Sequence, residues 1–155
     1  MSEVVFRKAE KRDIPSLVDL NIRLKRLNEE FDPLLRVRSD IADKSKQYFE
    51  TAMSSPNSLV VVAEDGGRVV GFIKADIRER TFYEPRMEGN IVEFYLLPEY
   101  RRKGVGANLL EYAVKLLKEK AEIITAEFPS LNEIAVEFYT RQGYRGIVSI
   151  YARES

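Results

Sequence analysis

The chain has 155 residues, and its 25 lysines and arginines balance 25 aspartates and glutamates, so the formal net charge is zero. This length predicts one domain, and the balanced charge disfavours a nucleic-acid partner, because such binding relies on a basic excess. The absence of cysteine and histidine excludes disulfides, thiolate metal sites, cysteine nucleophiles and histidine acid–base catalysis.

The N-terminal third predicts a strand followed by two helices. A β-branched and aromatic run over residues 4–9 predicts the strand. Asp13 is predicted to cap the first helix, with Pro15 in its first turn and apolar residues at helical spacing behind it. A second helix is predicted to begin at Ser39 or Asp40.

The middle of the chain predicts three strands. Residues 59–63 and 68–75 are apolar runs joined by an Asp-Gly-Gly sequence typical of a hairpin. Residues 78–89 are polar and predict a loop or ragged strand ends. The next strand, over residues 90–97, is predicted to stop at Pro98.

The C-terminal third predicts helix, strand, helix and strand. The amphipathic pattern over residues 104–120 predicts a helix, and residues 123–128 predict a strand. Asn132 is predicted to cap a last helix that ends at Gly143, and residues 147–152 predict a final strand. The order βααβββαβαβ predicts an α+β fold with a mixed, mostly antiparallel sheet flanked by helices.

The most informative segment is a basic glycine turn between a strand and a helix. It reads Arg101-x-x-Gly104-x-Gly106-Ala107, preceded by Glu93-Phe94-Tyr95-Leu96 and containing Arg102, Lys103 and Val105. The first turn of a helix has unpaired amides and a partial positive charge, and glycine lets a phosphate approach the backbone. Residues 99–120 carry six basic and three acidic side chains. A pyrophosphate site is one interpretation, and a solvated charged turn is the other.

This segment resembles the coenzyme-A-binding motif of the GNAT N-acetyltransferase superfamily. Two further blocks are similar to that superfamily: residues 6–15 (FRKAEKRDIP) and residues 132–144 (NEIAVEFYTRQGY). Residues 126–132 (AEFPSLN) resemble the ribosomal-protein alanine N-acetyltransferase type. The resemblance implies a single acetyltransferase domain over residues 1–155, with acetyl-CoA as cosubstrate and no metal.

The resemblance also implies the coenzyme-binding residues. The backbone of Phe94, Tyr95 and Leu96 would pair with the pantetheine arm, and residues 101–107 would hold the pyrophosphate. Asn132 would bond the coenzyme arm, although a simple helix cap is an equal interpretation.

Three residues are candidates for catalysis. Tyr139 matches the superfamily tyrosine that protonates the departing sulfur, with an aromatic core residue as the alternative. Glu127 and Glu93 compete for the role of base, and either is alternatively a surface or ion-paired carboxylate. Without cysteine, we expect direct transfer to the amine in a ternary complex.

The acceptor is not identified by the sequence. Residues 27–40 and 78–90 combine acidic and aromatic side chains that would suit a cationic amine, such as a protein N-terminus, a lysine or a small molecule. A non-catalytic acyl-CoA-binding regulatory module is the alternative function. We expect a cytoplasmic protein without membrane association, and dimer formation is open.

Overall fold

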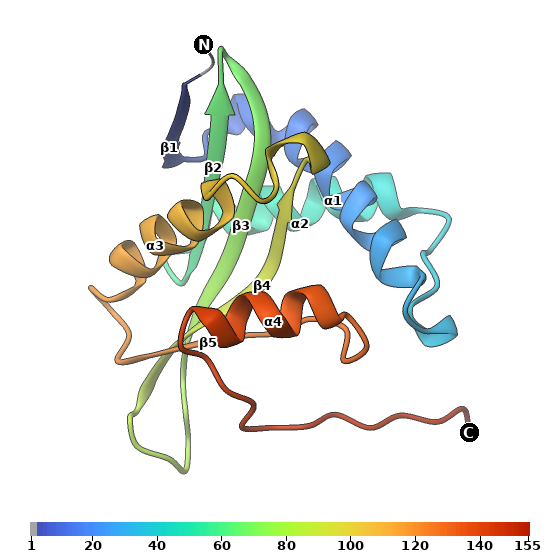
Figure 1. Ribbon diagram of the computed structural model, residues 1–155, viewed down its shortest axis with the longest axis vertical. Coiled ribbons are helices and arrows are strands. Elements are labelled where there is room, and N and C mark those ends of the chain that lie inside the picture. Colours follow the sequence, from blue (N-terminus) through green and yellow to red (C-terminus); the bar gives the residue numbers. More distant parts are fainter. Residues whose placement is uncertain (1–2) are drawn as a thin grey trace.

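A computed structural model describes residues 3–155 of the chain (Figure 1). Five strands and four α-helices follow one another, with short 3-10 helices at Lys11–Asp13, Pro33–Leu35 and Pro98–Tyr100. In chain order the elements are β1 (Val4–Lys8), α1 (Ile14–Glu29), α2 (Ile41–Met53), β2 (Ser58–Asp65), β3 (Arg68–Glu79), β4 (Met87–Leu96), α3 (Val105–Leu117), β5 (Ile123–Ala126) and α4 (Glu133–Arg141).

The strands form one mixed sheet in the order β1-β2-β3-β4-β5. Pairing is antiparallel from β1 to β4, whereas β5 runs parallel to β4. The hairpin between β2 and β3 turns through Gly66 and Gly67, whose φ angles of 58° and 83° suit the residue without a side chain. The predicted α+β class and mostly antiparallel sheet are confirmed.

Helices cover both faces of this sheet. Helices α1 and α2 pack together on one face, and α3 and α4 lie on the other (Figure 1). The apolar faces of these helices meet buried sheet residues such as Phe72, whose ring packs edge-on against Phe49 of α2 with 5.6 Å between centroids. The resulting core fixes the positions of the strand ends and helix termini described below.

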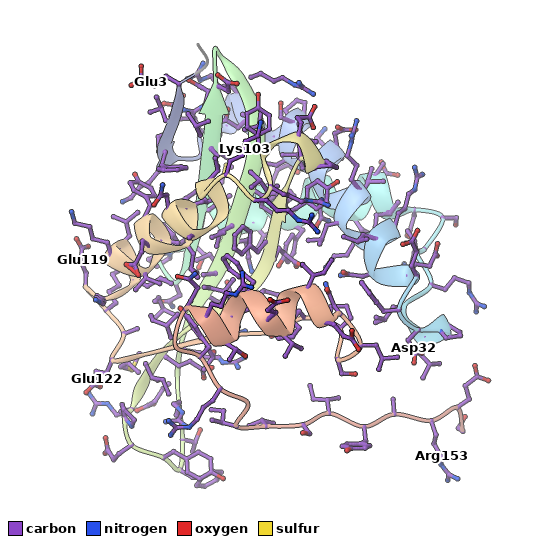
Figure 2. All side chains as sticks on the ribbon, viewed as in Figure 1. Glu3, Asp32, Lys103, Glu119, Glu122 and Arg153 are labelled. Atoms are coloured by element: carbon purple, nitrogen blue, oxygen red, sulfur yellow. The ribbon has the colours of Figure 1, made fainter. Side chains whose placement is uncertain are left out.

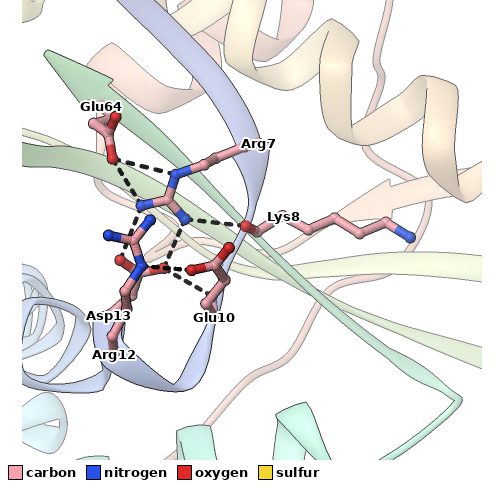
Figure 3. Close-up of polar contacts among 6 residues, drawn as sticks. All are labelled: Arg7, Lys8, Glu10, Arg12, Asp13 and Glu64. Atoms are coloured by element: carbon pink, nitrogen blue, oxygen red, sulfur yellow. Dashed lines mark hydrogen bonds and ion pairs between the residues drawn. The ribbon is translucent and has the colours of Figure 1, made fainter. Parts of the chain in front are cut away.

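Asp13 does more than begin the first helix. It precedes α1 as predicted, but its side chain does not cap the helix. The carboxylate instead accepts from Arg7 Nη1 at 2.8 Å, from Arg7 Nη2 at 3.0 Å and from the Glu10 amide at 2.7 Å (Figure 3). Arg7 also contacts Glu64 at 2.8 Å, so this ion-pair cluster ties β1, β2 and the start of α1 together.

The hairpin between β3 and β4 is longer than predicted. Residues 78–89 were predicted to form a loop or ragged strand ends, and the structure has both: β3 extends to Glu79, β4 begins at Met87, and residues 80–86 connect them. Cross-strand contacts account for the difference, because Arg78 Nε pairs with Glu88 Oε1 at 3.0 Å where the strands face each other.

The predicted last strand is not formed. Residues 147–152 have no secondary structure and are exposed, and the chain after α4 runs alongside that helix as an extended segment (Figure 1). The prediction was wrong because β-propensity creates a strand only where a neighbouring strand accepts its hydrogen bonds. Within residues 3–155, none of the helices is long and apolar enough to cross a membrane.

Candidate functional site

An open edge on β4 forms one wall of the site. Strand β4 has an extra residue, Val92, between the positions that pair with Ala75 and Lys74 of β3. Its pairing with β5 is limited to residues 88–91 and ends where the Glu127 amide donates to the Ile91 carbonyl at 3.1 Å. Strand β5 ends there, whereas β4 continues to Leu96, and within residues 3–155 no strand pairs with that side of residues 92–96.

The alternation of the antiparallel ladder decides which β4 groups face the gap. The Leu97 amide donates to the Val70 carbonyl of β3 at 2.9 Å. Because successive residues of a strand direct their amides and carbonyls to opposite sides, Tyr95 bonds toward β3, whereas Phe94 and Leu96 point away from it. The open edge therefore consists of the amide and carbonyl of Phe94 and the amide of Leu96, whose carbonyl accepts from Arg101.

The glycine turn follows directly. Arg102 and Gly104 have positive φ angles of 63° and 80°, and Gly104 precedes α3 without a side-chain cap. The first intrahelical bond runs from the Asn108 amide to the Gly104 carbonyl at 3.1 Å. The amides of residues 105–107 consequently have no acceptor within the helix, which makes this terminus a favourable place for an anion.

The three basic side chains of the turn are all exposed, but they differ in their contacts. Arg101 donates from Nε to the Leu96 carbonyl at 2.8 Å, and its guanidinium lies 5.1 Å from the Tyr95 ring centre. Arg101 is therefore anchored to the end of β4. Lys103 lies on the turn itself (Figure 2), and within residues 3–155 neither it nor Arg102 forms an ion pair.

Gly106 brings three elements together. A Cβ atom at this position would lie 3.7 Å from Phe138 of α4, 3.8 Å from Phe94 and 3.9 Å from Leu96 of β4. Phe94 and Phe138 themselves pack edge-on, with 5.7 Å between ring centres. The N-terminus of α3, the open edge of β4 and helix α4 thus adjoin one another.

Tyr139, the candidate proton donor on α4, is buried among aromatic side chains. It is only 7% exposed, stacks on Phe128 with 5.2 Å between centroids, and contacts Phe138 and Tyr144 edge-on. Burial, with a smaller contribution from Tyr144, raises its pKa above the ordinary tyrosine value. The phenol therefore stays protonated at neutral pH, as a proton donor must.

Asn132 has the capping geometry expected from its position. Its Oδ1 accepts from the Ala135 amide at 3.1 Å at the start of α4. This bond uses the side-chain oxygen and leaves the Nδ2 donor for another partner.

The two candidate bases have different surroundings. Glu127 is exposed, directly follows the last residue of β5, and its Oε1 accepts from Asn90 Nδ2 at 2.9 Å. Glu93 is 6% exposed, forms an ion pair with Lys25 and accepts from the Tyr48 hydroxyl at 2.8 Å. Glu127 is therefore bonded to a neutral amide, whereas Glu93 is bonded to a cation and a phenol.

Sequence reasoning missed the residues that surround Glu93. Lys25 comes from α1 and Tyr48 from α2, and the pKa of Tyr48 is raised by burial and by Glu93 beside it. Lys74 lies 4.5 Å from the Tyr48 ring centre and pairs with Asp76 at 2.7 Å. Lys74 is the one charged residue in the run of residues 69–75 (VVGFIKA), and that was the signal available in the sequence.

The two predicted acceptor segments are largely connections between secondary-structure elements. Residues 33–35 form a 3-10 helix after α1, near the labelled Asp32 (Figure 2), and residues 80–86 form the tip of the β3–β4 hairpin, where Phe82 and Tyr83 are exposed. Within residues 3–155, no group of three or more Asp or Glu residues has a geometry that could hold a metal ion.

Comparison with known proteins agrees with this geometry. The profile of the acetyltransferase (GNAT) family matches residues 23–144. An uncharacterized N-acetyltransferase of Archaeoglobus fulgidus is 32% identical over 144 residues, covering 90% of this chain and 92% of the relative. The chain belongs to the GNAT acetyltransferase family. It is accordingly an acyltransferase, and the resemblance seen in the sequence is confirmed.

Solved structures of other GNAT proteins share the fold. A predicted acetyltransferase of Clostridium acetobutylicum, solved with acetyl-CoA, superposes with a TM-score of 0.80 at 18% identity over 98% of this chain and 96% of that one. A ribosomal-protein-alanine N-acetyltransferase of Brucella melitensis gives a TM-score of 0.74 at 17% identity over 98% and 99%. At these identities the likeness concerns the fold.

Proposed function

We propose that this GNAT protein transfers an acetyl group from acetyl-CoA directly to a primary amine. The observation that carries the proposal is the continuous surface formed by the open β4 edge and the uncapped N-terminus of α3. Such a surface offers backbone donors and acceptors to an amide-containing arm and free amides to a phosphate.

The residues present fit coenzyme A. Phe94 and Leu96 would hold the pantetheine arm through their backbone groups. The amides of residues 105–107, with Arg102 and Lys103, would hold the pyrophosphate. Arg101 would act by fixing the end of β4, Tyr95 would support the Arg101 side chain with its ring, and Asn132 would use its free Nδ2 donor. When bound, acetyl-CoA supplies a thioester whose carbonyl carbon accepts the amine.

Proton transfer would use side chains of this chain alone. A lysine-like amine has a pKa near 10.4, so it must lose a proton before it can attack. A carboxylate would take the ammonium proton before the carbon–nitrogen bond forms. As the carbon–sulfur bond breaks, Tyr139 would give its phenolic proton to the sulfur, and the second proton lost by the nitrogen would restore the phenol through solvent. Because the chain has no cysteine, an acetyl-cysteine intermediate is not available.

Glu127 is the better candidate for the base. It is exposed, and its only side-chain partner within residues 3–155 is the neutral amide of Asn90, so it can still accept a proton. Both carboxylate oxygens of Glu93 already accept hydrogen bonds, Oε1 from Lys25 and Oε2 from Tyr48. We assign Glu93 a positioning role, in which it keeps α1 and α2 at a fixed distance from β4.

The acceptor would be a protein N-terminus, a lysine side chain or a small-molecule amine. Asp76, Glu93 and Glu127 all lie close enough to Tyr48 to raise the pKa of that phenol. Lys74 pairs with Asp76 and Lys25 with Glu93, so within residues 3–155 Glu127 is the one of the three carboxylates without a cationic partner. Negative charge favours the approach of a cationic amine. One of the similar structures is named a ribosomal-protein-alanine N-acetyltransferase, which makes peptides beginning with alanine the first acceptors to try.

The direct test is release of coenzyme A thiol with a panel of acceptors. The cysteine-free chain contributes no thiol of its own, so the assay has no background from the protein. The panel contains N-terminal peptides, lysine peptides blocked at the N-terminus, polyamines and aminoglycosides. We expect release above the hydrolysis rate with at least one class. Tight coenzyme binding without turnover on any class would instead support a non-catalytic acyl-CoA-binding module.

A further inference from the structure

Asn90 of β4 is a polar residue buried within the sheet. It is 3% exposed, and its neighbours across the strands are Asp76 of β3 and Thr125 of β5. A buried amide costs free energy unless its donors and its acceptor are paired. The Nδ2 group of Asn90 donates to Glu127 Oε1 at 2.9 Å, and its Oδ1 accepts from Thr125 Oγ1 at 2.9 Å. Asn90 therefore links the proposed base to the neighbouring strand.

The side chains of Asn90, Thr125 and Glu127 lie on the same face of the sheet. Asn90 and Thr125 are aligned across the two parallel strands, and Glu127 follows Thr125 by two residues, which is the period of a strand. The chain still follows β4 at this point, because the Glu127 amide donates to the Ile91 carbonyl at 3.1 Å. Glu127 is thus attached to β4 twice, through its backbone and through its side chain.

The amide of Asn90 has one orientation that suits an ionised Glu127. A carboxylate without a proton accepts hydrogen bonds and donates none, so it must face the NH2 group and not the carbonyl oxygen of the amide. The oxygen then faces Thr125, whose hydroxyl is the one donor that reaches it within residues 3–155. Thr125 therefore orients Asn90, and Asn90 in turn orients the carboxylate.

The hydroxyl of Thr125 has one hydrogen and two acceptors within reach. Besides Asn90 Oδ1, its Oγ1 lies within hydrogen-bond distance of Glu88 Oε2. Glu88 is 7% exposed, and Arg78 donates to it from Nε at 3.0 Å and from Nη2 at 3.2 Å. Because Arg78 supplies two donors, Glu88 depends less on Thr125, and the hydroxyl can serve Asn90.

The second carboxylate oxygen of Glu127 is left for the reaction. Asn90 occupies Oε1, and within residues 3–155 no group donates to Oε2. The side chain is exposed, so Oε2 is accessible to an ammonium group. We propose that Asn90, oriented by Thr125, is a positioning residue that holds Glu127 so that Oε2 takes the proton of the acceptor ammonium. This inference rests on the proposed role of Glu127 as the base, and the step moves one proton from nitrogen to oxygen.

Substitutions that preserve side-chain shape test the positioning. Asn90→Leu and Thr125→Val remove the hydrogen bonds with little change in volume, whereas Thr125→Ser retains the hydroxyl. We expect kcat to fall about tenfold or more for the first two, with the KM for acetyl-CoA within a few-fold, and Thr125→Ser to retain most of the rate. Thr51→Val is the control, because Thr51 is exposed on α2 and forms no side-chain hydrogen bond within residues 3–155.

Combined substitutions show whether Asn90 acts through Glu127. If it does, Asn90→Leu should lower kcat no further in a Glu127→Gln background. Equal losses with and without Glu127, or an unchanged kcat in Asn90→Leu, would overturn the proposal. Thr125→Val provides the same test if Asn90→Leu does not fold, because valine is a favourable residue in a strand.

A measurement that needs no turnover separates this inference from the proposed activity. NMR follows the two side-chain amide protons of Asn90. We expect the chemical shift of at least one of them to change in Glu127→Gln and in Thr125→Val, and to change little in Thr51→Val. No response to Glu127→Gln would refute the contact itself. A response combined with full activity of Glu127→Gln, or with no turnover on any acceptor, would refute the proposed base or the proposed activity, and the positioning role with it, while the contact stands.

Discussion

The rings of Phe128 and Tyr139 lie parallel, with 5.2 Å between their centroids and 3° between their planes. Phe128 directly follows Glu127, so the stack connects the segment that carries the proposed base to the helix that carries the proposed acid. Such a contact stabilises the pair by about 0.5–1.5 kcal/mol beyond the area it buries. This contact therefore helps to fix the relative position of the proposed base and the proposed acid.

Replacement of Phe128 by leucine tests this contact. We expect kcat to fall about tenfold or more, because misplacement by a fraction of an ångström impairs proton transfer, while the KM for acetyl-CoA stays within a few-fold. Steady-state kinetics measure both parameters. The control is Phe82→Leu, which replaces an aromatic residue at the exposed hairpin tip. Equal effects of the two substitutions would count against a positioning role.

Paired substitutions separate the two carboxylates. Glu127→Gln should lower kcat by about a hundredfold near pH 7, and the deficit should shrink as the pH approaches the pKa of the acceptor amine, which then deprotonates without a base. Glu93→Gln should mainly lower stability, because it leaves Lys25 without its ion-pair partner. Rates across pH and urea unfolding measure these effects. The opposite pattern would make Glu93 the base.

We predict that glycine is required at residue 104 because of its backbone conformation, and not because a side chain would lack space there. Its φ is 80° and a Cβ atom would meet nothing within 4 Å, so Gly104→Ala should cost about 1–2 kcal/mol through strain alone. The turn would also shift, so the KM for acetyl-CoA should rise. Gly66→Ala is the matched control, because that hairpin glycine also has a positive φ and open space. If both variants left the KM unchanged, the turn would not hold the coenzyme.

The Arg7–Asp13 pair predicts a pH dependence of stability. Hydrogen bonds from Arg7 hold the pKa of Asp13 below its ordinary value. The ionised carboxylate therefore contributes stability above the unfolded-state pKa of about 3.9, and this contribution is lost as the pH falls through the lower folded-state value. Asp13→Asn should reduce the free energy of unfolding by about 1–3 kcal/mol at pH 7, with a smaller difference below pH 4.

Urea unfolding at both pH values measures this difference. Asp19→Asn is the control, because Asp19 forms an exposed pair with Arg23 within one helix and should contribute little. A pH-independent effect at Asp13 would mean that shape, rather than charge, explains the destabilisation.

Much of the fold could be predicted from the sequence where periodicity and turn residues agreed. The hairpin at residues 66–67, the capping of α4 by Asn132 and the glycine turn before α3 all follow from local chemistry. The prediction of a last strand was wrong because strand formation depends on long-range pairing rather than on local chemistry. Residues 147–152 have strand propensity, but whether they pair depends on a partner that local sequence does not specify.

The candidate site was likewise predictable only where its residues lie together in one local segment of the sequence. The glycine turn and Tyr139 lie in sequence blocks that resemble the GNAT superfamily, so they were found. Tyr48 and Lys25 reach Glu93 from helices 45 and 68 residues away in sequence, and no local pattern connects them to it. The position of the extra residue Val92 in β4 likewise depends on how β4 pairs with β3, which no local pattern specifies.

The proposed mechanism rests most directly on the phenol of Tyr139, and its removal is the decisive measurement. Tyr139→Phe is compared with Tyr144→Phe, which removes a hydroxyl from the neighbouring ring, and thiol release is measured with saturating acetyl-CoA and acceptor. We predict that kcat falls about a hundredfold or more for Tyr139→Phe alone, with the KM for acetyl-CoA within a few-fold. A Tyr139→Phe variant that turns over at nearly the unsubstituted rate would contradict the proposed proton donor.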